Sequence, residues 1–225
     1  MENIFNSNDF PARDVLDAWA DVTRDRVMPV SFRLVDTDVF HGWLRAMPLG
    51  PVRVSAMAYP SSCTLRTPKM IRVSDPECLQ VGFMRSGSHV LEQNRMHAPL
   101  SPGELVLFDS SRPYVTYAKG NESVVIQFAR TLLPIPVRHL EQLICRPLPG
   151  DKGIGRLPAD FLTNLTDDSA SYTPQDAARL GTVAVDLVTA VLTTRRNWRA
   201  SLRHCALLPA KMRTGLSARG SGAAL

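Results

Sequence analysis

The feature that most constrains the fold is the hydrophobic period between residues 31 and 130. Apolar and polar residues alternate here at every second position, and turn-forming clusters interrupt the alternation about every 8–12 residues. Val52–Tyr59 shows the alternation clearly, while Leu100–Tyr117 combines a Pro-Gly turn, a short apolar run typical of a strand covered on both faces, an Asp-Ser-Ser corner and a second extended piece. Such a region predicts the wall of a small β-barrel or jelly roll.

The segments of this region with strand character are Phe32–Val35, Phe40–Met47, Val52–Tyr59, Met70–Val73, Cys78–Arg85, His89–Glu92, Leu105–Phe108, Tyr114–Tyr117 and Ser123–Phe128. Turns are expected to join them as hairpins at Pro48–Pro51, Ser86-Gly87, Pro99–Gly103 and Gly120-Asn121. The predicted barrel therefore covers residues 31–130.

Helical periodicity lies on both sides of the barrel. Asp14–Val27 has one apolar face and is ended by Pro29, so residues 1–30 are expected to form an N-terminal helical arm. After the barrel the period becomes helical again, with short helices expected at Val137–Cys145 and Leu157–Leu165 and a flexible joint at Gly150–Gly155. The fold class predicted is α+β, a barrel followed by a helical dimerisation segment over 131–200.

The strongest helix start is Thr173 followed by Pro174 and Asp176, which supply an N-cap, a proline at the first helical position and an acid in the first turn. An apolar stripe at helical spacing follows, made by Leu180, Val183, Ala184, Leu187, Val188 and Val191. This stripe is expected either to pack on its own sheet or to form the seam of a homodimer.

Charge is distributed unevenly along the 225 residues. Residues 195–225 contain seven Arg or Lys and no acid, whereas residues 1–194 carry 19 basic and 21 acidic side chains. A nearly neutral body does not support nucleic-acid binding by a broad basic face. The basic tail, expected at 201–225, predicts at most weak contact with phosphates.

The sequence lacks signals for secretion or membrane insertion. Its first residues contain acids and no apolar signal core, and the apolar stretch Leu180–Leu192 is short and contains Asp186. The cysteines Cys63, Cys78, Cys145 and Cys205 are widely separated and form no C-x-x-C pair. A cytoplasmic protein with reduced thiols and no membrane partner is expected.

Two catalytic interpretations have too few residues to support them. His89, Glu92 and His97 supply too few ligands for a metal, so no metal and no cofactor is expected and surface histidines are the simpler interpretation. Asp109–Ser111 with His97 suggests a nucleophile and base, but there is no Gly-x-Ser-x-Gly elbow and a polar turn explains the same residues. No catalytic residue is assigned.

A barrel of this size can hold one small ligand between its inward side chains. The residues expected to line such a pocket are Trp43, Met57, Tyr59, Phe83, Met84 and Phe108, with Arg66 or Arg95 as partners of an anion. The alternative is that these apolar side chains only form the core.

Several short motifs follow one another along the chain: Arg66-Thr67-Pro68, then Gly82 and Gly87, Gln93–Arg95, Leu100–Glu104 and Asp109–Tyr114. In this order they resemble the N-terminal sensor domain of AraC/XylS-family transcription regulators. The resemblance covers about Phe10–Arg199, and the Arg-Pro-Tyr ending of the last motif is its most specific part.

The resemblance implies a cupin-like barrel that binds an effector or only dimerises, helices that carry the dimer contact, and a C-terminal module of two helix-turn-helix units. The 27 residues after Trp198 are too few for that module. We therefore expect a truncated sensor and dimerisation domain that reaches DNA only through full-length relatives. A stand-alone cupin-like enzyme or small-molecule-binding protein, and a non-functional remnant, are the alternatives.

Overall fold

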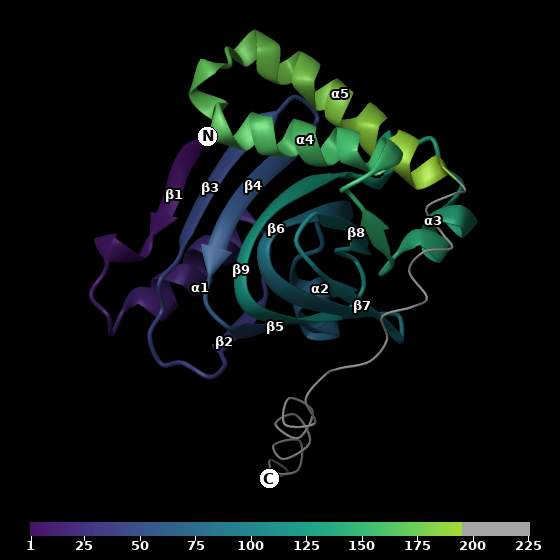
Figure 1. Cartoon of the computed structure of the whole chain (residues 1–225). Coiled ribbons are helices and arrows are strands. Elements are labelled where there is room, and N and C mark those ends of the chain that lie inside the picture. Colours follow the sequence, from purple (N-terminus) through teal and green to yellow (C-terminus); the bar gives the residue numbers. More distant parts are fainter. Residues whose placement is uncertain (195–225) are drawn as a thin grey trace.

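The computed structural model describes residues 1–194, and these form one curled antiparallel sheet with helices packed against it (Figure 1). Its ten strands are β1 (Glu2–Asn6), β2 (Ser31–Leu34), β3 (Trp43–Leu49), β4 (Val52–Tyr59), β5 (Ser62–Arg66), β6 (Cys78–Gln93), β7 (Met96–Leu100), β8 (Glu104–Asp109), β9 (Tyr114–Ala129) and β10 (Pro147–Pro149). The predicted α+β class and the β-barrel are confirmed. The tail expected at 201–225 lies outside the described residues.

β6 and β9, each of 16 residues, form the long central pair of the sheet. Their register shifts between Met84 and Ser86 and again between Gly87 and Ser88. Gly87 has a φ of 83°, and a Cβ there would lie 1.7 Å from the carbonyl oxygen of Gly120. Only glycine fits such a close crossing of two backbones, and the bulge lets the pair curl.

The hairpin turns expected at Ser86-Gly87 and Gly120-Asn121 are therefore wrong. The chain does not reverse at either position, and the four shorter strands expected on either side merge into β6 and β9. Glycines inside paired strands produce a bulge where their neighbours along both strands stay in the ladder.

The two halves of the central pair have different neighbours, which closes the sheet into a barrel. In one half β8 and then β10 extend from β6, while β4, β3 and β1 extend from β9. In the other half β7 pairs with β6, and β5 and β2 extend from β9. The sheet takes β1 and β10 from outside residues 31–130, so it extends beyond the expected barrel boundaries.

One expected strand is a helix: Met70–Val73 belongs to α2 (Pro68–Val73). The Thr67 hydroxyl accepts a hydrogen bond from the Met70 N–H at 3.2 Å, and Pro68 occupies the first turn. A capped start with a proline favours a helix and outweighs apolar alternation in so short a segment.

The sequence patterns do not predict four of the strands, β1, β5, β7 and β10. β1 falls within the expected helical arm but pairs with β3. β7 contains Pro99, which was expected in a turn; this edge strand pairs with β6, so the missing N–H leaves the ladder intact. β10 has three residues, too few to show a period.

The helices agree better with expectation. α1 (Val15–Arg26) and α3 (Val137–Leu143) lie where they were predicted. α4 (Gly153–Asp167) begins before the predicted Leu157 and absorbs part of the flexible joint. Short 3-10 turns complete the helical elements, at η1 (Ser7–Asp9), η2 (Arg130–Leu132) and η3 (Ser169–Ser171).

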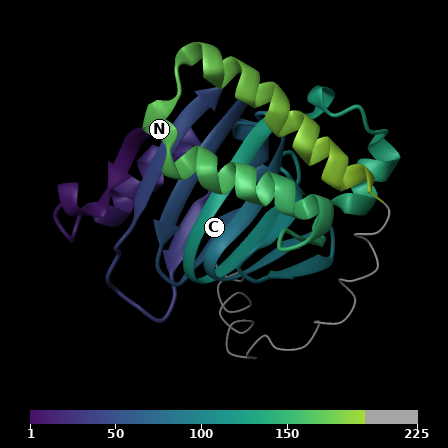
Figure 2. The ribbon, with the colours of Figure 1, turned by 45° about the horizontal axis from the view of Figure 1, so that its top comes forward.

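α5 (Pro174–Thr193) lies beside α4 on the outer face of the sheet (Figure 2). Its predicted cap is a full capping box, because the Thr173 hydroxyl accepts from the Asp176 N–H at 3.2 Å and the Asp176 carboxylate accepts from the Thr173 N–H at 3.0 Å. A Cβ at Gly181 would lie 1.9 Å from the Leu49 carbonyl oxygen, so the helix rests directly on β3. None of the helices in residues 1–194 is long and apolar enough to cross a membrane.

The apolar stripe of α5 divides between two environments. Ala184, Val188 and Val191 are at most 3% exposed and belong to the main core under the helix. Val183 is 43% exposed, and Leu180 and Leu187 are half-buried. Both uses considered for the stripe thus have residues available, packing on its own sheet on one side and an outward face on the other.

Candidate functional site

The barrel contains a partly open cavity of about 110 Å³. Inward side chains of β4, β5, β6, β8 and β9 form its wall, and α1 contributes Trp19. Trp19 is 2% exposed, and its ring centroid lies 5.8 Å from those of Phe32 and Tyr59. The N-terminal arm is therefore part of the cavity wall.

The bulges decide which residues of β6 face the cavity. Before the bulge the even-numbered Gln80, Gly82 and Met84 line the wall, and after it the odd-numbered His89 and Leu91 do so. β9 changes parity in the same way near its own glycine. Side chains alternate between the faces of a strand, so an irregularity in register exchanges the inward and outward sets.

Polar groups converge on this mostly apolar space. The Tyr114 hydroxyl donates to the Met28 sulfur at 3.4 Å, and the Gln80 amide donates to the same sulfur at 3.6 Å. Burial raises the pKa of Tyr114 to about 12, partly offset by Arg66, and burial followed by the proximity of Tyr114 raises the pKa of Tyr59. Both phenols are therefore protonated hydrogen-bond donors at neutral pH.

His89 is a residue of the cavity wall with a buried polar atom that has no partner within residues 1–194. Its Nε2 is buried and has no hydrogen-bond partner among the described residues. Burial lowers the pKa of this imidazole to about 4, so the ring is neutral at pH 7. Two other buried atoms, Ser62 Oγ and Asn121 Oδ1, also have no partner, but neither residue lines the cavity. A buried unpaired nitrogen in a cavity wall is a site for a ligand's polar group.

The cavity is electrically neutral, since none of its lining residues is Asp, Glu, Lys or Arg. A charge placed in such an environment without a partner carries a large desolvation cost. The arrangement is suited to hold an uncharged small molecule by apolar contact and a few hydrogen bonds.

Four of the residues expected to line a pocket do so: Met57, Tyr59, Met84 and Phe108. Phe83 does not, because it follows Gly82 on the same strand and faces the outer core under the helices. Trp43 lies outside the barrel, where the Arg45 guanidinium stacks 5.0 Å from its ring centroid. Sequence reasoning missed Trp19, His89 and Tyr114, and only the bulges and the docking of α1 reveal them.

The two arginines expected to bind an anion are not in the cavity wall. Arg66 is fully buried and donates to three backbone carbonyls, those of Ser110 at 2.8 Å, Pro29 at 2.8 Å and Ser74 at 2.7 Å. Its donors are thus committed to holding three segments together. Arg95 is exposed in the turn between β6 and β7, with a φ of 62°.

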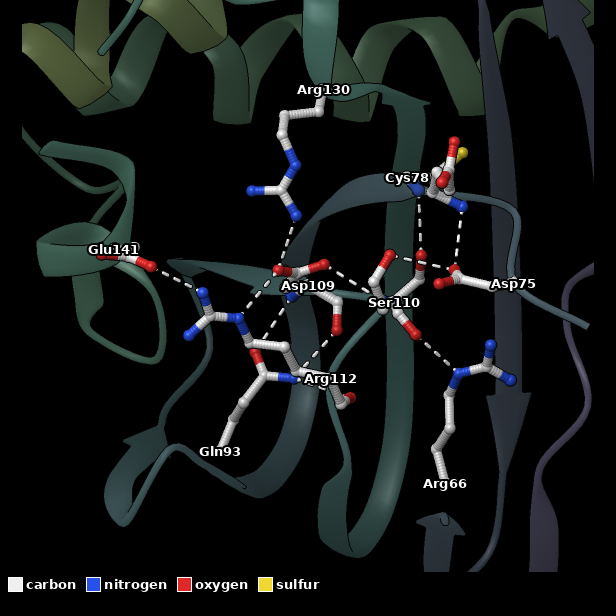
Figure 3. Close-up of polar contacts among 11 residues, drawn as sticks. Arg66, Asp75, Cys78, Gln93, Asp109, Ser110, Arg112, Arg130 and Glu141 are labelled. Atoms are coloured by element: carbon white, nitrogen blue, oxygen red, sulfur yellow. Dashed lines mark hydrogen bonds and ion pairs between the residues drawn. The ribbon is translucent and has the colours of Figure 1, made fainter. Parts of the chain in front are cut away.

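The Asp109–Arg112 corner is a structural hub (Figure 3). The fully buried Asp109 carboxylate accepts from Arg130 at 2.7 Å and lies 3.3 Å from the Arg112 guanidinium, which also contacts Glu141 at 2.7 Å. The Gln93 side chain closes the corner from β6 by pairing with both backbone groups of Asp109 at 2.9 Å. The motif that carries the family resemblance therefore fixes the barrel end to η2 and α3.

The side chains considered for a nucleophile and a base each bond to other partners. The Ser110 hydroxyl accepts from the Cys78 N–H at 2.9 Å, and the Ser111 hydroxyl donates to Asp75 at 2.9 Å. His97 pairs instead with Glu92 at 3.0 Å across β6 and β7. Within residues 1–194 no group of three His, Cys, Asp or Glu side chains lies close enough to hold a metal.

A curled antiparallel barrel that contains a neutral cavity and carries a helical layer outside defines a class of small ligand-binding barrels. Comparison with known proteins gives the family. The model of the AraC-binding-like domain matches residues 19–193, and the chain belongs to this family. It is an AraC-type cupin-like sensor domain, as the short motifs indicated.

Two individual proteins are similar over most of the chain. The uncharacterized protein in the nit 5'region of Bacillus sp. (strain OxB-1) is 25% identical over 198 residues, which is 86% of this chain and 76% of that protein. The crystal structure of the AraC-like transcriptional activator CuxR matches with a TM-score of 0.73 and 23% identity, over 83% of this chain and 68% of that one. At this identity the second match shows a shared fold.

Proposed function

We propose that this chain is the effector-sensing part of an AraC-type transcription regulator, with the effector held in the barrel cavity. The observation that carries the proposal is the neutral cavity with the unpaired nitrogen of His89 in its wall, inside a domain of the AraC-binding-like family. The fold of an AraC-like transcriptional activator supports the regulatory role.

The contacts beside the cavity supply a route from effector to helices. Met84 and Ser123 line the cavity, and their neighbours Arg85 and Glu122 face the other way. The Arg85 guanidinium lies 3.5 Å from the Glu122 carboxylate. It also donates bidentate hydrogen bonds to the Asp167 carboxylate at the end of α4, at 2.8 and 3.2 Å. A change in strand curvature at the cavity thus acts on α4, and through it on α5.

The second part of the proposal is a homodimer seam on α5. Val183 is 43% exposed and Leu187, one turn further along the helix, is half-buried, whereas Leu180 packs partly against the main core. On α4, Leu157 is 54% exposed. Contact between two copies through this face would bury it. DNA would then be read by a module outside residues 1–194 or by a full-length relative, because residues 1–194 carry 19 basic and 21 acidic side chains.

We also propose that the chain is not an enzyme, in keeping with its regulator-like family. Metal analysis of the purified protein discriminates between the two classes. Stoichiometric iron, manganese or zinc would favour a cupin-like enzyme instead.

The sensing proposal is tested by a thermal-shift screen of small molecules with the wild type and two variants. Gly82→Val fills the cavity, while Ser88→Val places the same side chain at an exposed position of the same strand. A ligand present at a hundred times its dissociation constant adds about 2.7 kcal/mol of apparent stability. We expect compounds whose thermal shift is lost in Gly82→Val and kept in Ser88→Val. Compounds whose thermal shift is the same in both variants as in the wild type would refute the cavity as the binding site.

A further inference from the structure

The wall chemistry narrows the class of effector. We propose that the cavity selects an uncharged aromatic molecule about the size of a monosubstituted benzene, anchored through one polar group to Nε2 of His89. This inference rests on the proposed sensing function and adds the ligand's size, charge and anchoring atom.

Size follows from the volume. The cavity measures about 110 Å³. An engineered apolar cavity of roughly 150 Å³ in another protein holds benzene, so one ring is the upper scale of ligand for this smaller space, and a small substituent requires the adaptable methionine side chains of the wall to shift. A disaccharide or a fused-ring compound would require the barrel to open.

Charge follows from the lining. No lining residue is Asp, Glu, Lys or Arg, and the buried Arg66 has its donors engaged by three backbone carbonyls. A carboxylate or an ammonium group would enter without a countercharge, which is strongly unfavourable. The ligand is therefore neutral when bound.

Aromatic character follows from what surrounds the space. Trp19 and Tyr59 contribute rings on one side, and Phe108 and Tyr114 form an edge-to-face pair at 5.5 Å on another. Three methionines also line the wall, Met28, Met57 and Met84. An aromatic ring packs favourably against the edge of another ring and also against a thioether sulfur. The flexible methionine side chain can adapt its shape to the ligand.

The anchor follows from the unpaired atom. Nε2 of His89 is buried without a partner, whereas Gln80 and the Tyr114 hydroxyl already bond to the Met28 sulfur. A ligand group that bonds to this nitrogen satisfies an otherwise unpaired polar atom, and a ligand without such a group does not.

The test measures dissociation constants of phenol, toluene, cyclohexanol and benzoate by calorimetry at pH 7. We expect phenol to bind about tenfold tighter than toluene because of the bond to His89. Cyclohexanol should bind more weakly than phenol, and benzoate at least a hundredfold more weakly. Equal binding of phenol and cyclohexanol would remove the aromatic requirement, and tighter binding of benzoate would overturn the charge argument.

His89→Leu should reduce the phenol-to-toluene preference to about one while toluene still binds, and His139→Leu, an exposed histidine on α3, should leave it unchanged. If His89→Leu does not fold, the imidazole ¹⁵N resonance of His89 Nε2 in the wild type decides. It should shift with phenol and not with toluene, and no difference between the two would overturn the anchor.

These outcomes separate this inference from the sensing function. If other compounds bind in a manner that Gly82→Val abolishes, sensing stands and the ligand class proposed here is wrong. If no compound binds in the cavity at all, both fail.

Discussion

His89 shows at the scale of one residue how burial changes the chemistry of a common side chain. On an isolated strand it is a partly charged surface residue near neutral pH, and in the barrel it is a neutral group with a pKa of about 4. The shift has a consequence for stability that is independent of any ligand.

Because the folded-state pKa is lower than the unfolded value of about 6.5, the unfolded chain takes up a proton first as the pH falls. The contribution of His89 to the free energy of unfolding is therefore constant above about pH 7. It decreases as the pH falls from 6.5 to about 4. Between pH 7.5 and 5 the loss from this group is about 2 kcal/mol. Urea unfolding at both pH values should show this difference for the wild type and not for His89→Gln; equal losses in the two proteins would contradict it.

Arg66 is the second residue whose role only its surroundings define. Arg66→Met keeps much of the side-chain volume but leaves three backbone carbonyls without their donor. The bond to Ser110 is buried and the other two are part-buried, so water can replace part of what is lost. Since a buried unsatisfied group costs about 1–3 kcal/mol, we expect a loss of about 2 kcal/mol or more in the free energy of unfolding. Arg138→Met on the exposed face of α3 is the matched control and should change stability by less than about 0.5 kcal/mol. A loss of under 1 kcal/mol for Arg66→Met would mean that water replaces the guanidinium.

Among the elements, α5 combines a strong local start with a demanding packing site. The capping box at Thr173 and Asp176 satisfies N–H groups at its first turn, and hydrogen bonds from Thr173 lower the pKa of the Asp176 carboxyl. Thr173→Ala should reduce the free energy of unfolding by about 1 kcal/mol. Thr182→Ala, exposed on the same helix, is the control. Equal effects of the two substitutions in chemical denaturation would show that the cap does not contribute.

The central pair of strands shows why element boundaries were harder to predict than element types. The alternation on either side of Gly87 and Gly120 identifies extended chain correctly, but a glycine in a strand and a glycine in a turn look alike in sequence. The distinction depends on the partner backbone, which lies more than thirty positions away along the chain. Phe83 and Met84 were both expected in the pocket, but neighbouring residues of a strand face opposite sides, and only Met84 lines the cavity.

At the scale of the whole molecule the outward face of α5 makes a prediction about assembly. Val183→Asp and Leu187→Asp place charges on the face proposed as the seam and should convert a dimer to a monomer in size-exclusion chromatography with light scattering. Cooperative unfolding should be retained, since Val183 is 43% exposed. Val191→Asp is unsuitable as a test because Val191 is 3% exposed and belongs to the core. A dimer that persists with both substitutions would place the interface elsewhere.

The sequence alone determined the barrel with its helical layer, the capped helix α5 and the family, because these depend on local periodicity, turn chemistry and short motifs. Only the tertiary structure decided which side chains line the cavity, that Arg66 binds backbone instead of a ligand, and that Trp19 and His89 belong to the site. The physical reason is that a residue's period along the chain fixes its element, whereas the face it presents depends on register shifts and long-range contacts that no local pattern contains.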